Sequence, residues 1–67
     1  MSNPITDVHI HFSHLDGNAF GILGTVAKAM RQNKIEKLVI DDFIQDATSG
    51  DYDYLVATVL KYVHLDY

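Results

Sequence analysis

The sequence predicts a small α+β domain with the element order β-α-α-α-β, in which a two-stranded sheet of the terminal strands packs on three helices. Three observations predict this fold. Apolar and polar residues alternate at both ends of the chain, apolar residues recur every three or four positions between those ends, and clusters of turn residues separate the segments. The 67 residues have room for one hydrophobic core, so residues 1–67 are expected to form a single domain.

The first segment, residues 5–13, is predicted to be a strand with one buried face. Its apolar side chains fall on alternate positions, at Val8, Ile10 and Phe12. The intervening positions are polar: Asp7, His9, His11 and Ser13. Strict alternation is typical of a strand that covers a core on one side only. We therefore expect the two histidines to face away from the core.

Three helices are expected next, over residues 18–33, over residues 35–47 and from residue 52 onward. Each shows the three- and four-residue spacing of a helix with a buried stripe. The first stripe holds Phe20, Ile22, Leu23, Val26, Ala27, Ala29 and Met30. The second holds Ile35, Leu38, Val39, Phe43 and Ala47. The third holds Tyr52, Leu55, Val56, Val59, Leu60 and Val63.

Turn-forming residues set the expected ends of these helices. Asn18 and Asp51 are predicted N-caps, because their side chains can accept hydrogen bonds from the first free N–H groups of a helix. Asn33 and Gly50 are predicted to take the left-handed conformation that ends a helix.

Two glycines lie inside the first predicted helix, at positions 21 and 24. Glycine costs about 1 kcal/mol relative to alanine in a helix interior. That cost suggests a packing reason, so we expect the turn at residues 48–51 to pass close to this helix. Gly24→Val would then destabilise the fold by more than helix propensity alone.

The last segment, residues 62–67, alternates again. Val63 and Leu65 are expected to face the core, and Tyr62, His64 and Asp66 the other side. We expect this strand to lie beside the first one, with their relative direction left open. An open sheet edge can pair with another chain, which predicts a homodimer.

The composition narrows the function classes. Nine acidic residues against five basic ones give a net charge of −4, which disfavours binding to nucleic acid because phosphate backbones need cations. No apolar run approaches the roughly 20 residues that span a bilayer, and no secretory leader is evident. The sequence therefore predicts a cytoplasmic protein without a membrane partner. The absence of cysteine excludes disulfides and thiolate metal sites.

Asp7-Val8-His9-Ile10-His11 is the segment most suggestive of chemistry. It resembles the Asp-x-His-x-His strand of metal-dependent amidohydrolases, whose histidines bind zinc. Enzymes of that superfamily need a barrel of about 250 residues to complete the site, which this chain cannot supply. If the last strand lies beside the first, His64 and Asp66 could join His9 and His11 in an exposed, adventitious zinc or nickel site. The alternative is that these are ordinary solvent-facing strand residues.

The start of the first helix is a second candidate site. Backbone N–H groups at a glycine-containing helix start can hold a phosphate or carboxylate. An anion or nucleotide site there would be built by six residues of the two turns, namely Asp16, Gly17, Asn18, Ser49, Gly50 and Asp51. Capping by the protein's own side chains is the favoured alternative, because neither a G-x-G-x-x-G motif nor a P-loop lysine is present.

Two stretches resemble a group of short bacterial and bacteriophage proteins of uncharacterised function that carry the motifs D-G-N-A-F-x-I-L-G and A-T-S-G-D-Y-D-x-L. Here they occupy residues 16–24 and 47–55. The resemblance covers nearly the whole chain and implies a bacterial or phage origin. It implies no activity, cofactor or catalytic residue.

The sequence thus favours a non-catalytic protein without a cofactor that acts through protein–protein contacts, as a bacterial or phage accessory factor. The alternative is a small-ligand module that binds an anion or nucleotide at residues 16–24. Metal-assisted hydrolysis on the three histidines ranks third.

Overall fold

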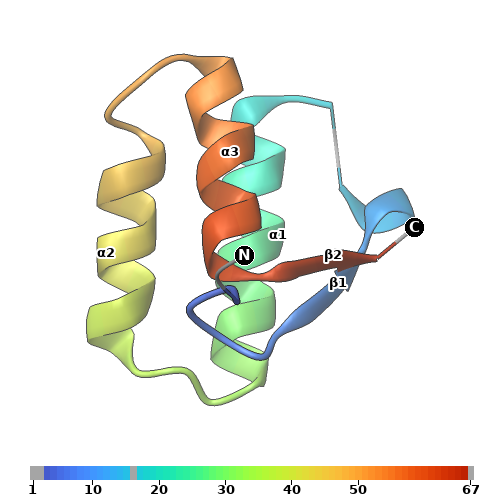
Figure 1. The fold of residues 1–67 in the computed structure, drawn as a ribbon, viewed down its shortest axis with the longest axis vertical. Helices are drawn as coiled ribbons and strands as arrows, with labels where there is room; N and C mark the ends of the chain where they lie inside the picture. Colours follow the sequence, from blue (N-terminus) through green and yellow to red (C-terminus); the bar gives the residue numbers. More distant parts are fainter. Residues whose placement is uncertain (1–2, 16, 67) are drawn as a thin grey trace.

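A computed structural model describes residues 3–15 and 17–66, without the side chain of Phe12. It confirms the predicted element order (Figure 1). Strand β1 covers His9–His11 and is followed by the 3₁₀ turn η1, Phe12–His14. The helices are α1, Ala19–Gln32, α2, Lys37–Ala47, and α3, Tyr52–Tyr62, and strand β2 covers His64–Asp66. The predictions for Phe12 as a core residue and for Asp16 as a ligand-binding residue fall outside the described part.

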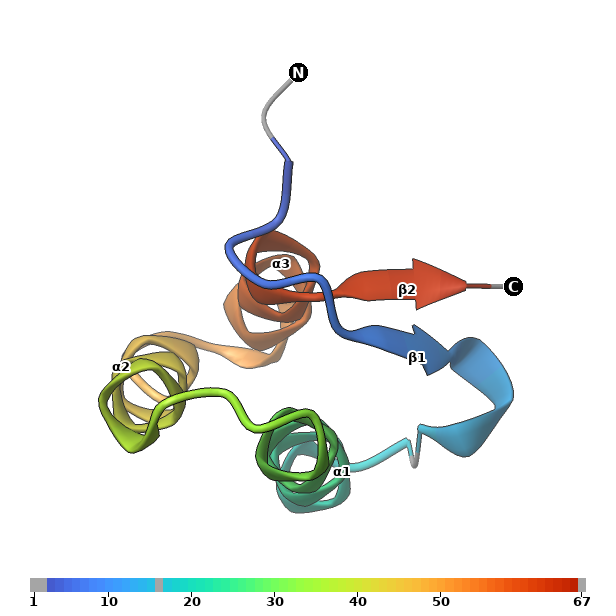
Figure 2. The same cartoon turned by 90° about the horizontal axis from the view of Figure 1, so that it is seen from below.

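The three helices form a triangular bundle with the sheet on one side of it (Figure 2). Strand β2 continues directly from α3, and β1 lies between β2 and α1 in this view. The strands are parallel and pair His9 with His64, Ile10 with Leu65 and His11 with Asp66. Ile10 is buried, whereas His9 and His11 are exposed, so the predicted alternation is confirmed.

The regular part of the first strand is shorter than the predicted segment. Residues 12–14 turn into η1, and the residues before Val8 pair with the end of α3 instead of with β2. Ile5 N–H donates to the Lys61 carbonyl and Thr6 N–H to the Tyr62 carbonyl, each at 3.0 Å.

The core lies between the helices and behind the sheet. Phe43, Met30 and Val26 are fully buried at its centre, and the ring of Phe43 meets that of Tyr62 edge-on at 5.3 Å. The other buried apolar residues are Val8, Ile10, Ile22, Ala27, Ile40, Ala47, Leu55, Val59 and Val63.

Four residues predicted in the buried stripes are exposed: Phe20, Leu38, Tyr52 and Leu60. Phe20 and Tyr52 lie in the first turns of α1 and α3, at one end of the bundle. Leu38 lies on the side of α2 opposite to the buried Ile40, Phe43 and Ala47. Leu60 lies on the outer side of α3, whose buried residues are Leu55, Thr58, Val59 and Tyr62. Tyr62 was predicted to face away from the core, and this prediction was wrong because its side chain is buried.

Both predicted N-caps are confirmed. The Asn18 side chain accepts Gly21 N–H at 2.8 Å, and the Asp51 side chain accepts Tyr54 N–H at 2.9 Å. The predictions about left-handed residues were wrong. Asn33 ends α1 with φ −92°, the next residue, Lys34, has φ 61°, and no described glycine has a positive φ, Gly50 included.

The predicted close approach at Gly24 was also wrong. Gly24 is exposed, and apart from its chain neighbours and the nearby backbone of α1, no atom lies within 4 Å of a Cβ built on it. Gly50 is the crowded glycine instead, because a Cβ there would lie 2.8 Å from the Cβ and Cγ of Tyr54. None of the helices in the described ranges is long and apolar enough to cross a membrane.

Candidate binding surfaces

The predicted metal-binding histidines lie on the exposed face of the sheet. The parallel register places His9 beside His64, and their imidazole rings stack with centroids 4.3 Å apart and planes 6° from parallel. His9 Nδ1 lies 3.0 Å from Asp66 Oδ2. The structure thus brings His9, His64 and Asp66 together, as expected from two paired terminal strands.

His11, the third predicted ligand, lines the same hollow as His9 and Asp66, but its ring is engaged by Ser13. Its Nδ1 accepts Ser13 N–H at 3.2 Å and lies 2.7 Å from Ser13 Oγ. The ring of His14 lies near that of His11, with the two ring centroids 5.8 Å apart. His14 was not among the metal ligands predicted from the sequence, although its position three residues after His11 could have suggested it. Within residues 3–15 and 17–66, no three His, Asp or Glu side chains form a group that could hold a metal ion.

The two turns predicted to form a ligand site do lie close together. Tyr52 Oη donates a 2.9 Å hydrogen bond to the Gly17 carbonyl, which ties the start of α3 to the start of α1. Asn18 and Asp51 use side-chain oxygens as helix caps, and Ser49 Oγ donates to the Asp46 carbonyl at 2.7 Å. These groups satisfy the chain's own backbone, so the anion site stays a prediction that no observed contact favours.

The same end of the molecule is apolar on its outside. Phe20 is 86% exposed, and Tyr52 is 46% exposed. A larger hollow of about 340 Å³ lies on one side of Tyr52, lined by Leu15, Gly17, Ile22, Tyr52, Val56, Val59 and Leu65. A smaller hollow of about 230 Å³ is lined by Ala19, Phe20, Leu23, Ala47, Thr48, Gly50, Asp51, Tyr52 and Leu55. We call Phe20, Tyr52 and the two hollows the apolar end surface.

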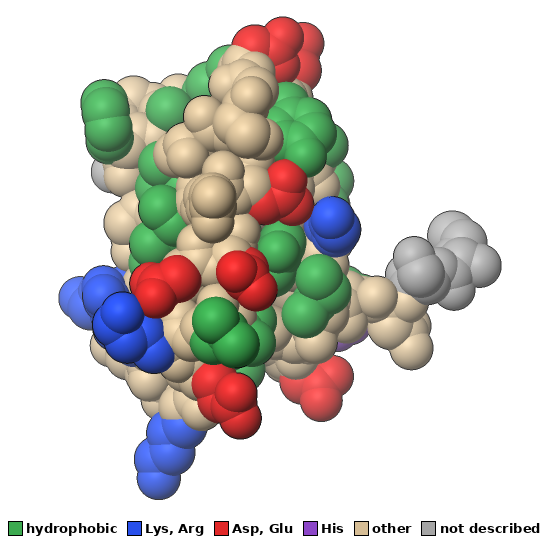
Figure 3. Space-filling view, turned by 90° about the vertical axis from the view of Figure 1, so that its left-hand side faces the viewer, with side chains coloured by type: hydrophobic (Ala, Val, Ile, Leu, Met, Phe, Trp, Pro, Cys, Tyr) green, Lys and Arg blue, Asp and Glu red, His purple; other side chains and the backbone are tan. Residues whose placement is uncertain are grey.

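Charge is unevenly distributed along the helices. The apolar end surface lies where α1 and α3 begin, at the upper end in Figure 1, and Asp51 and Asp53 stand there. The five cationic residues lie from the second half of α1 to the first residue of α2, and in the last turn of α3: Lys28, Arg31, Lys34, Lys37 and Lys61. On the face drawn in Figure 3, basic atoms lie only in the middle and lower parts, whereas acidic atoms are spread from the top to the bottom.

A polar cluster on the outside joins α2 to α3. Tyr54 Oη donates to Asp46 Oδ1 at 2.5 Å, and Lys61 Nζ lies 3.3 Å from Asp46 Oδ2. The Tyr54 hydrogen bond is the main reason why the pKa of Asp46 lies below its ordinary value. The hydrogen bond to Asp46 likewise raises the pKa of Lys61, and burial raises that of Tyr62. We assign this cluster a structural role, because it connects helices and faces no hollow of the apolar end surface.

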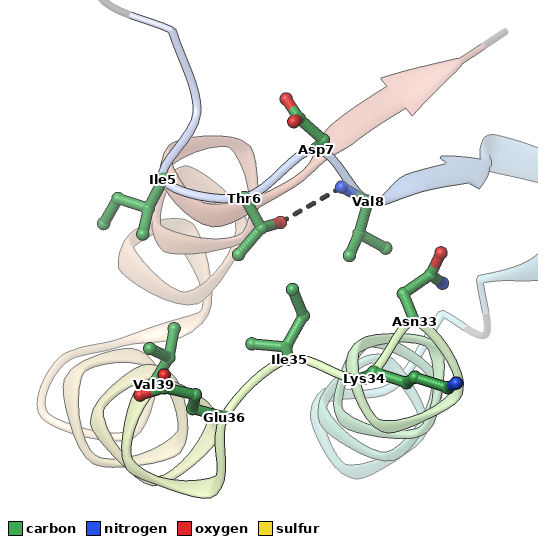
Figure 4. A pocket seen from close by; sticks show the side chains of 9 residues that line it. All are labelled: Ile5, Thr6, Asp7, Val8, Asn33, Lys34, Ile35, Glu36 and Val39. Carbon is green, nitrogen blue, oxygen red and sulfur yellow. Dashed lines mark hydrogen bonds between the residues drawn. The ribbon is translucent and has the colours of Figure 1, made fainter.

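A further hollow, of about 600 Å³, lies at the opposite end, between residues 5–8 and residues 33–39 (Figure 4). Val8, Ile35 and Val39 contribute apolar side chains to it. Its charged residues, Asp7, Lys34 and Glu36, have mixed signs, and the charges thus specify no ligand class.

Comparisons of the chain with protein-family models, with curated proteins and with solved structures found no match.

Proposed function

We propose that this chain is a small non-catalytic protein that acts through protein–protein contacts. The observation that carries the proposal is the exposure of Phe20 beside the smaller of the two hollows of the apolar end surface. The two sequence motifs support a bacterial or phage accessory factor, and the acidic composition is compatible with a cytoplasmic one.

Burial of the exposed Phe20 side chain by a partner would be energetically favourable. Burying a large apolar side chain stabilises a protein or a complex by about 1.5–3 kcal/mol. The exposed side chain of Phe20 lacks this stabilisation in the isolated chain, whereas Ile22 and Val26 on the same helix are buried. Aromatic residues are enriched at protein interfaces, and they account for much of the binding energy there. A partner that covers Phe20 would recover the lost burial.

A second copy of the chain is one candidate partner, since the two-stranded sheet leaves an edge of each strand open. Each strand has only three residues, and short edge strands are a common protection against edge pairing. The apolar end surface is therefore the better supported contact. Light scattering on the purified protein tests the homodimer, and a strictly monomeric result would contradict it.

Photo-crosslinking tests the proposed function directly. A photoreactive phenylalanine analogue replaces Phe20 in cells of the host, and in a matched control it replaces Gln45, which is exposed on α2. We expect a discrete protein adduct from position 20 and none from position 45. Adducts of equal yield from both positions, or none from position 20, would contradict the proposal.

A further inference from the structure

We infer that the apolar end surface binds a cationic amphipathic helix of a partner protein. This inference rests on the proposed function and names the chemistry of the partner. Three features of the surface support it: its two separate hollows, its exposed aromatic residues and its acidic rim.

The two hollows specify the apolar part of the partner. Tyr52 lines both of them, so one side chain separates them. Leu15, Ile22 and Val56 give the larger hollow an apolar wall, and Leu23 and Leu55 do the same for the smaller one. A helix in a groove presents apolar anchors at positions i and i+3 or i+4, and successive anchors can enter neighbouring hollows. Phe20, on the outer side of the smaller hollow, can then cover the second anchor.

The rim specifies the charge of the partner. Asp51 lines the smaller hollow, and Asp53, which lines neither hollow, is exposed in the first turn of α3 at the same end. Asp53 forms no ion pair with any residue in the described ranges. Neither hollow has a lysine or arginine in its lining. Complementary charge selects among partners that fit equally well, so the polar face of the partner helix should carry lysine or arginine.

The same charges argue against a second copy as the occupant. A two-fold contact through this surface would bring Asp51 and Asp53 of both copies into one interface. Like charges at an interface suppress association. The cationic residues that could relieve this repulsion line neither hollow and lie in the second half of α1, between α1 and α2, at the start of α2 and in the last turn of α3: Lys28, Arg31, Lys34, Lys37 and Lys61.

Titration of the ¹⁵N-labelled protein with three synthetic helical peptides tests the inference. All have about 18 residues, long enough to form helix. The first has leucines at i, i+3, i+4 and i+7 with lysines on the polar face. The second replaces the lysines by glutamates, and the third keeps the lysines but replaces the leucines by alanines. We expect the first peptide to bind at least about tenfold more tightly than the others, with shift changes centred on Phe20, Leu23, Tyr52 and Val56.

Two pairs of variants locate the contact. Phe20→Ser should weaken binding of the first peptide by about tenfold, whereas Leu38→Ser, at an exposed leucine in the first turn of α2, should leave it unchanged. Asp53→Asn should weaken binding of the first peptide by about threefold or more at low salt. Asp42→Asn, at an exposed position of α2, should leave that binding unchanged.

Other results would overturn the inference. If the glutamate peptide binds as tightly as the first peptide, the surface does not select a cationic partner. If the alanine peptide binds as tightly, charge attraction alone explains the binding and the hollows hold no apolar anchors. A dimer in solution that Phe20→Ser abolishes would make a second copy the occupant. In each case an adduct from position 20 would leave the proposed function standing, whereas no adduct at that position would count against both.

Discussion

The hydroxyl of Thr6 donates a 2.7 Å hydrogen bond to the carbonyl oxygen of Tyr62, the last residue of α3. The same carbonyl accepts Thr6 N–H at 3.0 Å, and Thr6 Oγ1 accepts Val8 N–H at 3.2 Å. Thr6 is buried, so these bonds are protected from water. They fix the segment before β1 against the point where α3 ends and β2 begins, and so hold the two strands side by side.

Replacing Thr6 by valine should therefore destabilise the fold. The variant keeps the shape of the side chain but leaves Val8 N–H without its acceptor in a buried place, which costs about 1–3 kcal/mol. Thr6→Ser keeps the hydroxyl and should cost less. Urea unfolding at neutral pH measures both, and equal losses for valine and serine would show that the hydroxyl contributes nothing.

The bond from Tyr54 to Asp46 predicts a pH-dependent contribution to stability. The folded-state pKa of Asp46 lies below its ordinary value of 3.8, chiefly because Tyr54 donates to the carboxylate. A carboxylate with a lowered pKa stabilises the fold above its unfolded-state pKa and loses that contribution as the pH falls through its folded-state pKa. Tyr54→Phe should thus lower the free energy of unfolding at pH 7, and the difference from wild type should shrink below pH 3.8.

Tyr52→Phe is the matched control, because the Tyr52 hydroxyl donates to the carbonyl of Gly17, which does not titrate. Its effect on stability should not change over the same pH range. Urea unfolding at pH values from 7 down to about 2.5 measures the free energy of unfolding of both variants. A constant effect of Tyr54→Phe would contradict the link to Asp46.

Gly24→Ala should stabilise the protein. Gly24 lies inside α1 and, apart from its chain neighbours and the nearby backbone of α1, has no atom within 4 Å of a built Cβ, so alanine adds no clash and gains about 1 kcal/mol in helix propensity. Valine is also a better helix former than glycine, so Gly24→Val should not destabilise, contrary to the expectation from sequence. Thermal and urea unfolding measure both changes. A loss of stability with alanine would indicate a neighbour at this position.

Gly50→Ala should have the opposite effect. The added Cβ would lie 2.8 Å from the Tyr54 Cβ and Cγ atoms, which are held near the start of α3 and cannot move far. Crowding of this kind costs about 1–3 kcal/mol. Tyr54→Ala removes the ring, though its Cβ stays, so Gly50→Ala should cost less in that background. Equal costs in both backgrounds would exclude the ring as a cause.

The order of elements was predictable because it depends on local rules. The alternation around Ile10 and the caps at Asn18 and Asp51 follow from side-chain direction and from free N–H groups, which do not depend on distant contacts. The exposure of Phe20, Leu38 and Tyr52 was not predictable in this way. Periodicity marks the apolar positions of a helix, but only the assembled bundle determines which of them a neighbouring element covers.

The candidate surfaces were predictable only in part. Pairing of the terminal strands brought His9 beside His64, as expected, but the turn after β1 directs His11 toward Ser13. Asn18 and Asp51 were ambiguous because the same side chains suit helix caps and ligand sites. The absence of lysine and arginine from the linings of the two hollows depends on how the helices are placed together, and no single segment of the sequence shows it.

The end of α1 gives the last prediction, at Lys34. Its N–H donates to the Arg31 carbonyl and Ile35 N–H donates to that of Met30, both at 3.0 Å, which is the pattern of a helix end with a left-handed residue. Lys34 takes that conformation with φ 61°, at a cost to a non-glycine residue of about 1–2 kcal/mol. Lys34→Gly should therefore stabilise the protein, by somewhat less than this cost because glycine makes the unfolded chain more flexible.

Lys28→Gly is the control for this change. It removes the same charge from an exposed position inside α1, where glycine should lower stability by about 1 kcal/mol. Urea unfolding should thus move in opposite directions for the two variants. If both variants lose stability equally, the positive φ at Lys34 stores no strain, and the left-handed helix end can be occupied by lysine without cost.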